Sequence, residues 1–134
     1  MRRAVTTLAL ALCLVGCGWL PPPGEPFELA TSWEPGSAEA PGACCPGWWV
    51  AGLLVVDPTH GTDIKVESGD YFATKGTTMP VLWWPTFTGR RFGNEVSVLD
   101  PHGNVVAKTG QRYRITGSFE KVGFVACGDM VTPQ

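Results

Sequence analysis

The chain has 134 residues and a formal net charge of −2 at pH 7, with 44% hydrophobic and 16% charged residues. This length allows one domain with a small core, and it leaves no room for two. Beyond Pro41 the acidic residues are balanced one for one by Lys and Arg. A neutral domain argues against nucleic-acid binding, which needs a basic face, and against a polybasic membrane-surface role.

The first residues have the layout of an export signal, since Arg2 and Arg3 precede a short apolar run. The run is too short to span a bilayer, because a transmembrane helix needs about 20 apolar residues. Its end, Leu14-Val15-Gly16-Cys17, resembles the lipobox of bacterial lipoproteins. The resemblance implies that residues 1–16 are a signal peptide and that Cys17 is acylated. We therefore expect a lipid anchor on the extracytoplasmic face of the cell membrane, with ordinary secretion as the alternative.

Residues 17–43 carry the lipidated cysteine and then a stretch rich in Pro, Gly and Glu. Repeated prolines interrupt both helices and strand ladders, so this range is predicted to be a disordered, acidic tether. Phe27, Leu29 and Trp33 are apolar within it. They are expected either to dock on the domain or on a partner, or to remain exposed.

From Trp48 onward, short β-rich runs alternate with Gly, Pro and Asp. Strands are predicted over 48–56, 64–67, 79–84, 95–99, 105–108, 111–115 and 123–127. Turns are expected at 57–61 and at 100–104, where Asp-Pro precedes Gly, and a loop is expected over 86–93.

Residues 44–134 are therefore predicted to form a single all-β domain of five to seven short strands. So few strands must close on themselves or stack, because an open sheet of this size leaves its edges and an apolar face wet. We expect a small closed or partly open barrel resembling the OB-fold. A two-sheet β-sandwich is the alternative.

Three cysteines remain after Cys13 leaves with the signal and Cys17 takes the lipid. An exported protein meets oxidising conditions, so one of Cys44 and Cys45 is expected to form a disulfide with Cys127. A bond between the adjacent Cys44 and Cys45 is the strained alternative.

Two pairs of adjacent tryptophans suggest a binding surface, with Trp48 beside Trp49 and Trp83 beside Trp84. Adjacent side chains of a strand point to opposite faces, so one of each pair is expected to be buried and the other at least partly exposed. The outward rings could form a platform for a small ligand, with Arg90 and Arg91 at its rim. The alternative is that they pack beneath the tether or a loop.

The two histidines, His60 and His102, follow Asp57 and Asp100 in the expected turns. Two His and two Asp are a possible ligand set for zinc or copper, but turns favour Asp for backbone reasons alone, so we expect no metal. No catalytic motif is present in the sequence, and we expect neither an enzyme nor a cofactor.

Segments 79–85, 88–91, 98–103 and 109–115 are similar to small exported proteins of actinobacterial type. That resemblance implies no activity and no site residue. We expect a noncatalytic, lipid-anchored β-domain that binds a small ligand or a partner protein of the cell envelope, and no nucleic acid. The alternative is a structural or assembly subunit of an envelope complex.

Overall fold

A computed structural model describes residues 24–31, 47–59 and 61–134, and the strands below lie in these ranges. The described residues form strands, turns and irregular segments without any helix, so none of them provides a helix that could cross a membrane. The strands are β1 (Glu25–Phe27), β2 (Trp48–Asp57), β3 (Gly61–Gly69), β4 (Thr78–Leu82), β5 (Thr88–Phe92), β6 (Glu95–Leu99), β7 (Val105–Lys108), β8 (Arg112–Glu120) and β9 (Gly123–Pro133).

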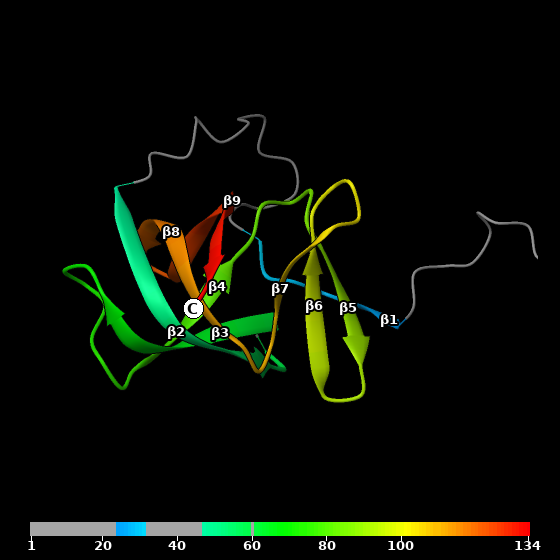
Figure 1. Cartoon of the computed structure of the whole chain (residues 1–134), viewed down its shortest axis with the longest axis horizontal. Helices are drawn as coiled ribbons and strands as arrows, with labels where there is room; N and C mark the ends of the chain where they lie inside the picture. Colours follow the sequence, from blue (N-terminus) through cyan, green and yellow to red (C-terminus); the bar gives the residue numbers. More distant parts are fainter. Residues whose placement is uncertain (1–23, 32–46, 60) are drawn as a thin grey trace, which may run out of the picture.

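Five of these strands close into a barrel in the order β2-β3-β4-β9-β8 (Figure 1). Neighbouring strands are antiparallel except β4 and β9, which run parallel. Strands β8 and β9 follow β4 only after three intervening strands, and then β9 inserts between β4 and β8, which gives a Greek-key arrangement. A five-stranded Greek-key barrel is the architecture of the OB-fold, so the all-β prediction and the preferred barrel are both confirmed.

Two glycines let the barrel strands bend. The register of β2 on β3 shifts between Ala51 and Gly52, and that of β8 on β9 shifts between Ile115 and Gly117. A Cβ on Gly52 would overlap the carbonyl oxygen of Lys65, and one on Gly117 would overlap that of Val125. Bulges of this kind increase the local twist of a strand, which a barrel of only five strands requires in order to close.

The other four strands form a second, antiparallel sheet in the order β1-β5-β6-β7. Two expectations were wrong here. The predicted loop over 86–93 contains β5, and part of the predicted tether, residues 24–31, packs on the domain through β1. Phe27 is half-buried and Leu29 is buried, whereas Trp33 and the remainder of the tether lie outside the described residues.

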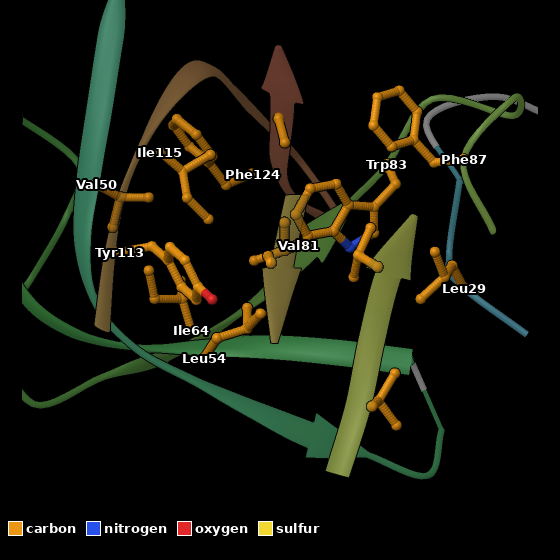
Figure 2. Packing of buried hydrophobic residues seen from close by; sticks show 14 of the residues in the cluster. Leu29, Val50, Leu54, Ile64, Val81, Trp83, Phe87, Tyr113, Ile115 and Phe124 are labelled. Atoms are coloured by element: carbon orange, nitrogen blue, oxygen red, sulfur yellow. The ribbon is translucent and has the colours of Figure 1, made fainter. Parts of the chain in front are cut away.

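One hydrophobic cluster joins the two sheets (Figure 2). Trp83 is fully buried, and its ring packs against that of Phe87 at 6.2 Å between centroids. Leu29 lies beside them in the same cluster, and the backbone N–H of Trp83 donates to the carbonyl oxygen of Ala30 at 2.9 Å. The segment that follows β1 thus contributes to the core and ties the second sheet to the barrel.

Candidate binding site

Four aromatic side chains gather at one end of the barrel, and we call this group the aromatic end: Trp48, Tyr71, Phe72 and Phe119. Trp48 opens β2, Tyr71 and Phe72 belong to the β3–β4 connection, and Phe119 lies near the end of β8. The exposed fractions are 41% for Trp48, 89% for Tyr71 and 60% for Phe72. Large side chains left this open to water in one group are typical of a binding surface.

The rings of the aromatic end contact one another edge to face. Phe72 lies 5.5 Å from Tyr71, 5.5 Å from Phe119 and 6.1 Å from Trp48, measured between ring centroids. Phe119 in turn lies 5.0 Å from the buried Phe124. The exposed rings are therefore supported by the barrel core, and edge-to-face pairs of this kind contribute about 0.5–1.5 kcal/mol beyond the area they bury.

A groove of about 550 Å³ adjoins the aromatic end. Phe72 and Phe119 form part of its wall, together with Met79, Pro80 and Val122. Val122, at the β8–β9 turn, is 68% exposed. Three threonines, Gly123 and the oppositely charged pair Glu120 and Lys121 complete the lining, so the groove is mostly apolar and carries no net charge.

The expected burial of one ring is wrong for Trp48 and Trp49, because Trp48 is exposed and Trp49 is only half-buried at the end of the barrel. Trp49 is half-buried, and the guanidinium of Arg114 lies over its ring at 4.1 Å from the centroid. The backbone N–H of Trp49 donates to Oδ2 of Asp70 at 2.9 Å, which fixes the start of the loop that carries Tyr71 and Phe72. Trp49 thus helps to position the aromatic end but does not extend it.

The second tryptophan pair is placed elsewhere. Trp83 is fully buried and donates its indole Nε1–H to Thr62 Oγ1 at 2.8 Å, while Trp84 is half-buried and packs on Phe87. The expected split between a buried and a partly exposed ring is confirmed for this pair. A ligand platform that includes Trp83 is wrong, because that ring belongs to the core between the two sheets.

The arginines proposed for the rim also lie away from the aromatic end. Arg90 and Arg91 are on β5 in the second sheet, on the opposite side of the molecule from the start of β2 (Figure 1). Arg91 donates from Nε to the carbonyl oxygen of Gly93 at 2.9 Å, and its guanidinium lies 6.0 Å from the ring centroid of Phe27. The structure therefore does not bring these arginines together with Trp48 and Trp49.

Of the expected disulfide residues, Cys127 alone is described. It is buried on β9, and its side chain is not without an interaction partner. Cys44 and Cys45 lie outside the described residues, as does Cys17, the expected lipid carrier. The disulfide with Cys127 and the acylation of Cys17 both stay predictions.

In both Asp-Pro turns the aspartate accepts hydrogen bonds from backbone N–H groups of the turn, as expected. Oδ1 of Asp100 accepts the backbone N–H of His102 and of Asn104, each at 2.9 Å. The backbone hydrogen bond from Asn104 contributes most to lowering the pKa of Asp100. Oδ1 of Asp57 accepts the N–H of Thr59 at 2.6 Å, and His60 lies outside the described residues. Within the described ranges, no group of three or more His, Cys, Asp or Glu side chains could hold a metal ion.

Sequence reasoning missed most of the aromatic end. It singled out Trp48 but not Tyr71, Phe72 or Phe119. A signal for the first two was present, because adjacent aromatic residues follow the turn-forming run Ser68-Gly69-Asp70, where apolar side chains have no core to enter. Phe119 had no such signal, since its contact with Phe72 depends on how two distant turns meet.

Comparison with known proteins identified no relative. No family model matches the chain, and there is no significant match among curated proteins or solved structures.

Proposed function

We propose that this chain is a lipid-anchored, extracytoplasmic binding module that acts without catalysis. Acylated Cys17 holds the protein on the membrane, and the OB-like barrel presents the aromatic end to a ligand or partner of the cell envelope. The observation that carries the binding role is the exposure of Tyr71 and Phe72 beside an apolar groove. Isolated exposed apolar side chains are ordinary, but a contiguous group of supported rings marks an interaction site.

The anchor is tested by replacing Cys17 with Ala and separating membrane from soluble fractions. The wild-type chain is expected in the membrane fraction and the C17A chain in the soluble exported fraction, because the substitution removes the residue that carries the acyl chains, and stable anchoring needs two or more of them. Firm membrane attachment of the C17A chain would refute acylated Cys17 as the anchor.

The binding role is tested by photocrosslinking in intact cells. A benzophenone amino acid at Tyr71 is expected to form a discrete covalent adduct, while the same probe at His102 serves as the control. Both positions are exposed and both lie in connections between strands, but His102 belongs to the second sheet. Equal adduct patterns at the two positions would argue against a specific site at the aromatic end.

A further inference from the structure

The barrel has an incomplete seam beside the aromatic end. Strand β4 pairs with β3 from Thr78 to Val81, whereas on its other side Val81 and Leu82 pair with β9 and Gly123 lies against the backbone of Pro80. The first half of β4, Thr78 and Met79, therefore has one edge without a neighbouring strand in the described structure. An unpaired edge of this kind is a template for an added strand.

The groove lies along this unpaired edge. Thr78, Met79 and Pro80 line it from β4, Val122 lines it from the β8–β9 turn, and Phe72 lines it from the β3–β4 connection. A chain lying along β4 in this groove would have main-chain groups on one side and apolar side chains within reach. We propose that the aromatic end binds an extended peptide segment of another protein by strand addition to the first half of β4.

This inference rests on the proposed binding function and names its partner class. Strand addition takes its affinity from main-chain hydrogen bonds and its specificity from pockets for alternate side chains. The groove supplies such a pocket between Phe72, Phe119 and Val122. Its two charged residues have opposite signs, so the charge of the groove favours a peptide without strong net charge over an anionic polymer.

Ring geometry disfavours a sugar as the occupant. A sugar stacks on a flat aromatic face, but the rings of Trp48, Phe72 and Phe119 are inclined at 63° to 66° to one another. Three mutually inclined rings form a corrugated surface with no shared plane. Such a surface holds protruding side chains, as in the cores of protein–protein interfaces.

The position of the anchor disfavours the bilayer as the occupant. Gly24 precedes β1 and is seven residues from Cys17, a span of at most about 25 Å in a fully extended chain. In Figure 1, β1 lies at one end of the long axis and the β3–β4 connection lies at the other. Acylation at Cys17 thus keeps the β1 end within this distance of the membrane, while the aromatic end lies at the far end of the long axis.

The test is a selection of random decapeptides, displayed on phage, against the purified full-length chain in detergent micelles. Selected peptides are then measured on two variants. Val122→Arg places a long charged side chain in the groove at an exposed turn position, and Val105→Arg places the same side chain at an exposed position on β7, away from the groove and the aromatic end. We expect V122R to weaken binding by about ten-fold or more, equivalent to about 1.4 kcal/mol, and V105R to change it by less than about two-fold.

Backbone N-methylation of the best peptide distinguishes strand addition from side-chain docking. Two peptides are compared, one methylated at the odd-numbered nitrogens and one at the even-numbered nitrogens. One is expected to lose binding and the other to keep it, because only every second N–H of an added strand points toward β4. The proposal is overturned if no peptide is selected, if binding is insensitive to V122R, or if the two N-methylated peptides bind equally.

Two further outcomes separate this inference from the proposed function. Self-association of the chain that V122R abolishes, without selection of a peptide, would assign the groove to a second copy and overturn strand addition by another protein. A cellular adduct at Tyr71 to a glycan would retain the binding module and refute the peptide. The peptide selection does not depend on membrane anchoring, because it uses the purified chain.

Discussion

The hydrogen bond from Trp83 to Thr62 is buried where the barrel meets the second sheet, and both residues are fully buried. Replacing Thr62 with Val keeps the shape of the side chain but removes the acceptor. The indole N–H is then left in an apolar site without a partner, which costs about 1–3 kcal/mol. A central value of about 2 kcal/mol corresponds to a fall in Tm of roughly 8–16 °C for a domain near 100 residues.

The measurement is thermal and urea unfolding of the full-length chain in detergent, followed by tryptophan fluorescence and circular dichroism. Thr88→Val is the matched control, because Thr88 is an exposed threonine on β5 and its replacement is expected to change the unfolding free energy by less than about 0.5 kcal/mol. If T62V unfolds at the same temperature as T88V, the bond contributes nothing, and our account of Trp83 as a positioned core residue is refuted.

Three other perturbations have definite expected results. Gly52→Ala forces a Cβ against a β3 carbonyl, so we expect a loss of about 3 kcal/mol or more in urea unfolding, against little change for Gly47→Ala, where the added Cβ meets open space. Leu29→Ala should cost about 2 kcal/mol, the low end for a core leucine, because Leu29 lies at the margin of the cluster; unchanged stability would show that the β1 segment is not part of the core. The pKa of Asp100 is lowered chiefly by the backbone N–H of Asn104. The ionised carboxylate therefore stabilises the folded state fully above the ordinary aspartate pKa, and this stabilisation is lost as the pH falls through the lowered pKa. The stability difference between wild type and Asp100→Ala should therefore shrink in acid, and a pH-independent difference would contradict this.

The barrel strands were predictable because their patterns are local. Along β3, the buried Ile64 and Val66 alternate with the exposed Lys65 and Glu67, a period of two that only a strand satisfies. The turns were predictable for the same reason, since Asp100 and the following Pro and Gly carry their own backbone preferences. Local chemistry of this kind determines where strands end, and the small number of strands then favours a barrel.

The second sheet was only partly predictable. Strand β5 reads Thr-Gly-Arg-Arg-Phe, without the apolar alternation that marks a strand, because one of its faces is largely exposed and Gly89 contributes no side chain. Strand β1 contains Pro26 and is three residues long. Strand β1 is a strand because β5 lies beside it, and pairing between segments more than 60 residues apart leaves no local pattern to read. Strand β5 also pairs with β6, which follows it directly.

The candidate site shows the same limit at a finer level. Alternation correctly separated Trp83 from Trp84, but it could not say that Trp83 faces a core shared by two sheets. Trp48 was found because it is adjacent to Trp49, whereas Phe72 and Phe119 become a site only because the β3–β4 connection meets the end of β8. A surface built from strand ends and a connection depends on topology, which sequence alone specifies least.

The outer edge of β1 and the unpaired half of β4 are protected to different degrees, and the difference bears on function. Proteins protect exposed edges with short strands, prolines and charges. The edge of the second sheet follows this rule, because β1 is three residues long and contains Pro26. The unpaired half of β4 is followed by a proline, Pro80, but it is bordered by Phe72 and Val122 rather than by charged side chains alone. An edge that is shortened yet surrounded by exposed apolar groups is poorly protected against pairing in general, but it is well suited to one short partner strand whose side chains fit the groove.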